Sequence, residues 1–278
     1  MTHRPFLAAN GPAILVEIAA TKGSTPRETD AFMLVSRDAL WGTIGGGQLE
    51  YLAIDHARRL LDTRSGASLL DIPLGPEIGQ CCGGRVEISF ARAEGETLAA
   101  LKRRIEDDAA RYPEVWLFGA GHVGTALAAA LAPLPLRVIV VETRADELKG
   151  LPQGVFPRLS ALPEALIGGI RPASAVVVLT HDHALDFLIA GAALRRRDLA
   201  YVGMIGSKTK RATFAGWARR DGLAEADIGR LVLPIGGASV RDKRPAVIAA
   251  MVAAELLTVL WQAGHAASEP AEARDTGT

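Results

Sequence analysis

Two adjacent cysteines are the first groups in this sequence that could do chemistry. Cys81 and Cys82 lie in the segment GQCCGG and are the only cysteines among the 278 residues. A bond between sequence neighbours would close a small strained ring, so we expect both thiols to be reduced. Thiolates are soft metal ligands, but a structural zinc site needs about four ligands and no second cysteine pair exists. The pair therefore indicates either an accessible thiolate that ligates a metal cofactor or handles sulfur, or two small buried side chains.

A glycine-rich segment, FGAGHVG, contains the clearest ligand-binding pattern. Gly119, Gly121 and Gly124 form GxGxxG between a predicted strand and a predicted helix, and His122 lies inside the pattern. Backbone N–H groups at a helix start favour a phosphate. Glu142 ends the next strand, where nucleotide-binding folds place an acidic residue against a ribose hydroxyl. Either the loop binds a phosphate, or its glycines only let strand and helix approach closely.

A polar segment, THDHALD, follows a strand of the second half. The carboxyl ends of parallel strands face the ligand crevice, so we expect His181 and Asp182 near the glycine loop. These residues fit contact with a ligand, and His181 and His183 together with Asp186 fit a metal site. Asp182 and Thr180 also fit a third role, as caps of the following helix.

A basic cluster follows another predicted strand, in the segment YVGMIGSKTKRA. Ser207 precedes a helix whose first turn contains Lys208, Lys210 and Arg211. A helix N-terminus combined with ammonium groups suits a phosphate. The same residues fit a solvated basic face equally well.

A second glycine run, GTIGGGQLE, precedes a helix in the first half. Gly45, Gly46 and Gly47 permit positive φ and close approach of a ligand, but they also suit a tight turn. Glu50, in the first turn of that helix, is placed to complement the helix macrodipole. We expect this run to contact a ligand, with the tight turn as the alternative.

The elements that must position these groups differ between the two halves. The first half has apolar runs of strand length, with helices predicted at 48–62 and 96–111. The second half alternates Val/Ile/Leu strands with helices of about 10–15 residues, which is typical of a parallel sheet covered on both faces. We predict an α/β protein with a C-terminal Rossmann-like, doubly wound parallel sheet, preceded by a smaller N-terminal α/β domain with a mixed sheet.

The domain boundary is predicted between Tyr112 and Pro113, because proline disfavours helix in the residue before it. The N-terminal domain, which carries the cysteine pair, then spans 1–112, and the Rossmann-like domain spans 113–263. Residues 264–278 contain little to bury and are predicted to be a disordered tail.

Composition and charge argue against several classes of function. Basic and acidic residues number 31 each, so no net charge attracts nucleic acid or an anionic membrane. Pro133, Pro135 and Glu255 interrupt the longest apolar stretches before they reach the roughly 20 residues of a membrane-spanning helix. The N-terminus has no apolar signal-peptide core. We expect a cytoplasmic protein that binds neither nucleic acid nor membrane.

Seven motifs along nearly the whole chain resemble the XdhC/CoxI family. In chain order they are TKGSTPRETDAFML, GTIGGGQLE, GQCCGG, FGAGHVG, THDHALD, VGMIGSKTKR and LPIGG. The resemblance implies a chaperone, not an enzyme, that binds and protects the molybdenum cofactor, in which molybdopterin carries molybdenum. It further implies sulfuration of the cofactor by a cysteine desulfurase, its insertion into apo-xanthine dehydrogenase, and a homodimer.

The resemblance also implies a set of site residues. In the family the cysteine segment is implicated in cofactor binding, which makes Cys81 and Cys82 candidate molybdenum ligands. Glu142 stands where many relatives carry Asp, and Arg241 to Arg244 depart from the family pattern, so no role is assigned to that segment. The candidate cofactor-binding residues are Gln80, Cys81, Cys82, Gly45, Gly46, Gly47, Gly119, Gly121, His122, Gly124, Glu142, His181, Asp182, Ser207 and Lys208.

Two other functions fit the residues. An NAD(P)-dependent oxidoreductase would bind its nicotinamide cofactor at the glycine loop and use His181 or His183 as proton donor. The cysteine pair has no role in that scheme. A nucleotide-responsive adaptor would bring the desulfurase and the target enzyme together without holding the cofactor.

Overall fold

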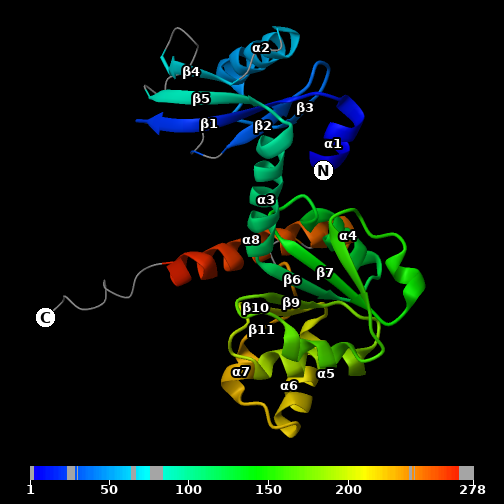
Figure 1. The fold of residues 1–278 in the computed structure, drawn as a ribbon. Helices are drawn as coiled ribbons and strands as arrows, with labels where there is room; N and C mark the ends of the chain where they lie inside the picture. The colour runs from blue at the N-terminus through cyan, green and yellow to red at the C-terminus, as the bar shows by residue number, and fades with distance from the viewer. Residues whose placement is uncertain are drawn as a thin grey trace, which may run out of the picture. The chain divides into compact units, whose positions relative to one another are not determined.

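The chain forms two compact units, Met1–Asp108 and Ala109–Thr278, in a computed structural model that describes residues 3–23, 29, 31–63, 67–75, 84–237, 240 and 242–268 (Figure 1). The division between the units lies within helix α3 (Gly95–Arg111). The sequence places the boundary just after this helix.

The first unit contains a five-stranded sheet with the order β3-β2-β1-β5-β4. All of its described strand pairs are antiparallel, so the prediction of a mixed sheet is wrong. Consecutive strands that are joined without a crossover helix pair antiparallel, as β1, β2 and β3 do. The elements are α1 (His3–Asn10), β1 (Ile14–Lys22), β2 (Phe32–Val35), β3 (Leu40–Gly42), α2 (Gly47–Thr63), β4 (Ser68–Pro73), β5 (Arg85–Arg92) and α3.

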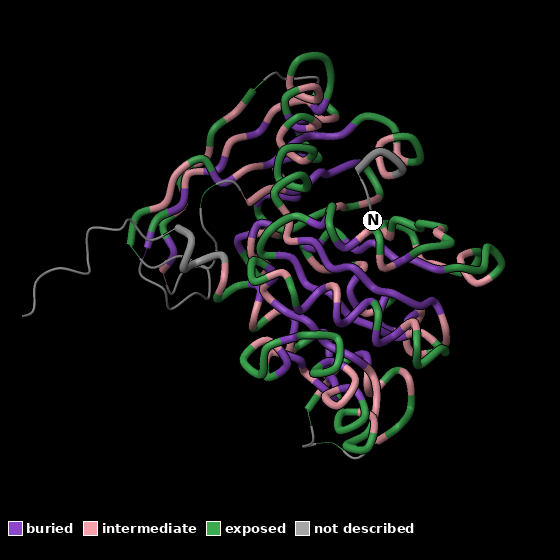
Figure 2. Tube along the Cα trace, turned by 90° about the horizontal axis from the view of Figure 1, so that it is seen from below, coloured by how far each residue is buried: buried purple, intermediate pink, exposed green. Residues whose placement is uncertain are grey.

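Both faces of this sheet bury apolar side chains. Along β1, Ile14 and Val16 join the core that also contains the buried face of α2, whereas Leu15 joins a smaller core with Leu101 of α3. This alternation follows from the two-residue period of a strand. Buried positions accordingly run along the strands, and exposed positions gather on helix surfaces and loops (Figure 2).

The second unit contains a six-stranded sheet with the order β11-β10-β9-β6-β7-β8, and every described pair is parallel. This is the doubly wound order of a Rossmann fold, so the predicted fold class is confirmed. The chain reverses its winding at β6, between β7 and β9. The elements are β6 (Glu114–Phe118), α4 (His122–Leu131), β7 (Arg137–Glu142), η2 (Ala145–Leu148), β8 (Val155–Leu159), η3 (Pro163–Gly169), β9 (Ala175–Val178), α5 (His183–Arg195), β10 (Tyr201–Met204), α6 (Lys208–Arg220), α7 (Glu225–Gly229), β11 (Leu231–Val232) and α8 (Pro245–Ser268).

Helices cover both faces of the parallel sheet. Val115 and Leu117 of β6 lie in the core beneath α4 and α8, whereas Trp116 and Phe118 lie in the core beneath α5, α6 and α7. Strand β6, which leads into the glycine loop, is therefore held between two layers of helices by buried apolar contacts. The carboxyl ends of β6, β7, β9 and β10 meet along one edge of the sheet.

Helix α8 is long and apolar enough over Pro245–Ala263 to cross a membrane by length and composition alone. This is weak evidence, because a core helix passes the same test, and one face of α8 lies in the core of the second unit. Glu255 accepts hydrogen bonds from the Tyr201 hydroxyl at 3.1 Å and from the Gly236 N–H at 2.8 Å. The helix continues to Ser268, into the predicted tail, and residues 269–278 lie outside the described part of the chain.

The two edges of the parallel sheet differ in how they end. Strand β11 has two residues, Leu231–Val232. At the opposite edge, β8 contains Pro157, whose partner in β7 is Val140. Proline has no N–H and is tolerated on an edge strand, where that donor would have no partner in the sheet.

Candidate functional site

The three glycines of the GxGxxG loop have different roles. Gly119 has φ of +118°, and a Cβ on it would lie 2.5 Å from the Leu179 carbonyl oxygen. A Cβ on Gly124 would lie 2.0 Å from the Gly119 carbonyl oxygen. Around Gly121, by contrast, no described heavy atom beyond its sequence neighbours lies within 4 Å of where a Cβ would be. Close packing therefore explains the first and third glycines but not the second, which faces free space.

Glu142 holds the glycine loop from below. Its Oε2 accepts a hydrogen bond from the Ala120 N–H at 3.0 Å, and its Oε1 accepts from the Thr143 N–H at 2.8 Å and the Arg144 N–H at 3.2 Å. The side chain is 5% exposed. We expected the Glu142 carboxylate to contact a ribose hydroxyl. Both of its oxygens instead accept hydrogen bonds from backbone N–H groups of the protein.

These contacts keep Glu142 ionised. Burial opposes its negative charge, but the hydrogen bonds from Ala120, Thr143 and Arg144 outweigh burial and lower the pKa of its carboxyl below the ordinary value of 4.5. Glu142 therefore positions the loop as a fixed negative charge.

Helices α4, α5 and α6 follow β6, β9 and β10 at the carboxyl edge of the sheet, and their N-termini differ. Asp182 caps α5, where its Oδ1 accepts from the Ala184 N–H at 2.7 Å and the Leu185 N–H at 3.3 Å, which confirms the capping interpretation. Ser207 caps α6 by accepting from the Lys210 N–H at 3.3 Å. At α4 the N-cap is Gly121, and no side chain in the described ranges caps this helix. The α4 terminus, with His122 exposed at its first position, keeps its N–H donors available.

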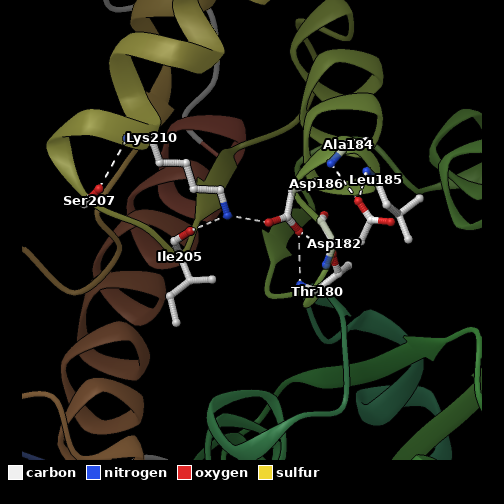
Figure 3. Close-up of polar contacts among 8 residues, drawn as sticks. All are labelled: Thr180, Asp182, Ala184, Leu185, Asp186, Ile205, Ser207 and Lys210. Carbon is white, nitrogen blue, oxygen red and sulfur yellow. Dashed lines mark hydrogen bonds and ion pairs between the residues drawn. The ribbon is translucent and has the colours of Figure 1, made fainter.

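The first turns of α5 and α6, which follow β9 and β10, are joined by a buried ion pair (Figure 3). Asp186 is fully buried, and its Oδ2 pairs with the Lys210 ammonium, whose side chain is 10% exposed. Asp186 Oδ1 accepts from the Thr180 hydroxyl at 2.6 Å and the Thr180 N–H at 3.1 Å. Lys210 also donates to the Ile205 carbonyl at 3.0 Å. One network therefore fixes the ends of both strands.

This network removes Asp186 from the predicted metal site. Its carboxylate faces Thr180 and Lys210, while His181 and His183 are exposed. Within the described ranges, no three His, Cys, Asp or Glu side chains are grouped so that they could hold a metal ion. The pKa of Asp182 is lowered by the backbone hydrogen bonds of Leu185 and Ala184, as expected for an N-cap carboxylate.

Two of the three cations in the basic cluster make intramolecular contacts that hold the fold together. Arg211 donates to the Leu233 and Leu231 carbonyls at 2.8 and 2.7 Å, and Lys210 is held in the buried pair. Lys208 is exposed at the start of α6. Of the three cations, Lys208 is thus the one that is available to a ligand.

In the glycine run of the first unit, the Glu50 carboxylate of the same chain already accepts hydrogen bonds from the turn. Glu50 Oε2 accepts from the Ile44 N–H at 3.0 Å, the Gly46 N–H at 3.1 Å and the Thr43 hydroxyl. The Gly45 N–H donates to Thr43 Oγ1 at 3.1 Å. Gly45, Gly46 and Gly47 have φ of 128°, 77° and 68°, so the run forms a tight turn around a carboxylate.

Some predicted residues are brought together and others are not. Gly119, Glu142, Thr180 and His181 line one small hollow of about 10 Å³, room for about one water molecule. The run at 45–47 belongs to the other unit. Gln80, Cys81, Cys82 and Arg241 lie outside the described residues.

The pairing of Asp186 with Lys210 was not predicted from the sequence. A signal was present, because Asp186 shares a helix face with Ile189 and Ala190, both of which are buried. A carboxylate on the buried face of a helix requires a buried partner. The sequence offers several candidate cations, so it does not identify Lys210 as that partner.

Comparisons with known proteins agree with this architecture. The model described as XdhC Rossmann domain matches residues 115–256, and the model of the XdhC and CoxI family matches residues 6–73. The uncharacterized protein YqeB of Escherichia coli (strain K12) is 28% identical over 271 residues, which cover 90% of this chain and 44% of YqeB. The chain thus spans less than half the length of that relative.

A solved structure has the same fold. A crystal structure described as a xanthine dehydrogenase from Bacillus halodurans matches with a TM-score of 0.73 at 18% identity, over 97% of this chain and 98% of that one. At this identity the likeness shows the fold alone. The two family models match parts of both compact units, and we conclude that this chain belongs to the XdhC and CoxI family.

Proposed function

We propose that this chain is a chaperone that binds the molybdenum cofactor and acts in the maturation of xanthine dehydrogenase. Membership of the XdhC and CoxI family supports a maturation role and is consistent with a protein that is not itself an enzyme. The observation that carries cofactor binding is the free space at Gly121 in front of the uncapped α4.

The residues at this edge fit the phosphate of a pterin cofactor. Main-chain N–H groups at a helix start bind phosphate, and the helix dipole favours the negative charge. Gly121 admits the ligand, Gly119 and Gly124 shape the turn, and Glu142 fixes the loop through Ala120. We assign phosphate contact to the peptide groups of 121–124, with His122, His181 and Lys208 as exposed polar groups on the same edge of the sheet.

The structure also reduces the number of candidate cofactor-binding residues. Asp182 and Ser207 serve as helix caps, and the donors of Ile44, Gly45 and Gly46 are already used, so we leave these residues out of the proposed phosphate site. Cys81, Cys82 and Gln80 remain in the proposal on the basis of the sequence. The bound cofactor supplies a molybdenum centre with an exchangeable ligand, and thiolates are ligands that suit soft metal chemistry.

The remaining parts of the proposal concern partners. Apo-xanthine dehydrogenase would receive the cofactor, and a cysteine desulfurase would supply sulfur to it. We propose a homodimer located in the cytoplasm, and no binding of nucleic acid or membrane. Family membership supports the dehydrogenase as a partner.

Cofactor retention tests the proposal. The full chain, purified from a host that makes molybdopterin, is expected to release a fluorescent oxidised pterin on denaturation. Gly121→Glu places a carboxylate where the phosphate would lie and should abolish retention. Gly169→Glu is the matched control, because Gly169 is exposed and has free space around its Cβ position.

Variants of the two cysteines test whether a thiolate contacts the cofactor. Cys81→Ala or Cys82→Ala should reduce retention if one thiolate contacts the cofactor, and unchanged retention in both would remove the pair from the mechanism. Absence of pterin from the unmodified protein would favour the adaptor. Saturable NAD(H) or NADP(H) binding at micromolar levels in calorimetry would favour the oxidoreductase instead.

A further inference from the structure

A cavity of about 160 Å³ lies at the same edge of the parallel sheet as the glycine loop. Its walls come from the end of β10, from the segment after β11 and from the first turns of α8. The lining is mostly apolar and includes Ile205, Ile235, Val247, Ile248 and Met251. Ile205, Val247, Ile248 and Met251 are only half-buried, so this part of the core stays in contact with solvent.

The size and chemistry of the cavity suit a flat ring. An apolar cavity of about 150 Å³ accommodates one benzene ring. Gly206, Gly236 and Gly237 add backbone to the lining, and Gly237 has φ of +71° with no heavy atom of the described residues near its Cβ position. Half-exposed apolar side chains gain about 25 cal/mol for each Å² that a ligand covers.

Among the described residues, Asp242 is the charged side chain that lines the cavity. Asp242 is 29% exposed at the side chain, and both of its oxygens face Arg244, with Oδ1 accepting the Arg244 N–H at 2.8 Å and Oδ2 accepting from Nε at 2.9 Å. Arg244 holds the pKa of this carboxyl below its ordinary value. Arg244 also donates from Nε to Oδ1 and from Nη2 to Oδ2, so the carboxylate is held in place on the cavity wall. The partly exposed negative charge of Asp242 favours N–H donors on the edge of a heteroaromatic ring over acceptors there.

The buried network described above supports a wall of this cavity. Lys210 donates to the Ile205 carbonyl, and a Cβ on Gly206 would lie 2.6 Å from Lys210 Cδ, so the lysine stem packs directly on Gly206. The Ile205 N–H donates to the Val178 carbonyl at 2.9 Å. The wall is thus tied to β9, the strand that lies between β10 and β6.

The cavity and the glycine loop lie on the same side of the sheet. Helix α8, which forms one wall, packs against α4 in the same core. Both helices begin at the carboxyl edge of the sheet. A ligand that places its phosphate at Gly121 and extends along this edge therefore meets the cavity.

We propose that this cavity binds the heteroaromatic ring of a ligand whose phosphate lies at the glycine loop. The shared chemistry is a phosphate-bearing ring with N–H donors on its edge, as in a pterin or a purine. The pterin assignment rests on the proposed function. The ring site itself rests on the cavity, the half-exposed apolar walls and Asp242.

Phosphate-free probes test the ring site separately from the loop. The full chain is titrated with 6-hydroxymethylpterin, followed by pterin fluorescence, and with adenosine, followed by calorimetry. Val247→Trp fills the cavity and should weaken ring binding by at least about tenfold, equivalent to about 1.4 kcal/mol. Asp242→Asn should weaken it less. Thr258→Trp is the matched control, because Thr258 is isosteric with valine and exposed on the same helix.

A second variant and a loop variant complete the design. Met251→Phe fills the cavity from another turn of α8 and replaces Val247→Trp if that variant fails to fold, as judged by thermal unfolding. Gly121→Glu should retain binding of the phosphate-free ring while it loses the whole cofactor. Undiminished ring binding in a folded cavity variant overturns the inference, as does absence of binding of both probes.

The outcomes also distinguish the two proposals. Binding of adenosine but not of the pterin, lost on cavity filling, supports the ring site and contradicts the proposed cofactor. Binding of the pterin probe by a protein that retains no cofactor when purified from a molybdopterin-producing host supports the ring site and contradicts the chaperone role. Retention of cofactor that is insensitive to cavity filling supports the chaperone role and overturns the ring site.

Discussion

Residues 45–47 and residues 119–124 are both glycine turns that precede a helix, yet their backbone donors have different partners. In the first turn, Glu50 accepts from the Ile44 and Gly46 N–H groups. In the second, Glu142 accepts from Ala120 alone among the loop residues, and the start of α4 has no side-chain cap in the described structure.

The difference lies in where the carboxylate comes from. Glu50 belongs to the helix that follows its turn, so it reaches back over the turn and occupies the place of an external anion. Glu142 comes from the neighbouring strand, so it holds the loop from the side of the sheet and leaves the helix start free. Glycine content alone therefore does not identify a ligand loop, because a chain that supplies its own anion has no donors left for another.

The largest effect is expected at Gly124. Gly124→Ala places a Cβ 2.0 Å from the Gly119 carbonyl oxygen, so α4 must move away from the sheet. We expect the free energy of unfolding to fall by about 3 kcal/mol, measured by urea denaturation. Gly121→Ala is the control, with an expected loss of about 1 kcal/mol or less, because its Cβ enters free space and only the poorer N-cap propensity of alanine acts against it. Equal losses in both variants would contradict the division of roles within the loop.

An intermediate effect is expected at Glu142. Glu142→Gln replaces a buried ionised acceptor of several N–H groups, so we expect a loss of about 2 kcal/mol in the free energy of unfolding. The acid dependence of stability should change as well. The folded-state pKa lies below the unfolded value near 4.5, so the contribution is present above that value and is lost as pH falls through the folded pKa.

Urea denaturation at a series of pH values below 4.5 measures this dependence. Glu142→Gln should unfold with a shallower loss of stability on acidification than the unmodified protein. Glu164→Gln is the control, since the described residues offer that carboxylate no hydrogen-bond partner. A slope that stays the same in Glu142→Gln would show that this carboxyl is not the acid-sensitive support of the loop.

The smallest effect on stability is expected at Glu50. Removing its carboxylate should give the turn at residues 45–47 free N–H donors, as the turn at residues 119–124 has. Glu50→Ala frees the Ile44 and Gly46 N–H groups and should cost about 1 kcal/mol of unfolding free energy. The empty turn should then accept an added anion, so sulfate should raise the melting temperature of the variant more than that of the unmodified protein. Sodium chloride at equal ionic strength is the control. An equal response of both proteins to sulfate would contradict the comparison.

The parallel half of the fold was predictable because its strands are nearly continuous apolar runs. RVIVVE and AVVVLT carry the pattern of strands buried on both faces, and helices alternate with them. The direction of strands in the first unit was not predictable, since short runs such as FMLV and LLDI are compatible with either direction of pairing. The pairing is decided by tertiary contacts of β1 with β2 and β5.

The candidate site was predictable in position but not in detail. Strand ends located Gly121, His181 and Ser207 at one edge of the sheet. The partners of the carboxylates were not predictable, because Glu142 reaches Ala120 and Asp186 reaches Lys210 through space, and local sequence does not encode such contacts. The cavity at α8 was not predictable either, because its walls come from segments that are separated in the sequence and meet only in the folded protein.

The edges of the parallel sheet have a consequence for self-association. A foreign strand laid along β8 would find no amide hydrogen at Pro157, and one laid along β11 would find only two residues to pair with. Sheets with long regular borders recruit further copies and grow into fibrils. Neither border of this sheet offers such a template, so the addition of further copies along this sheet should be disfavoured.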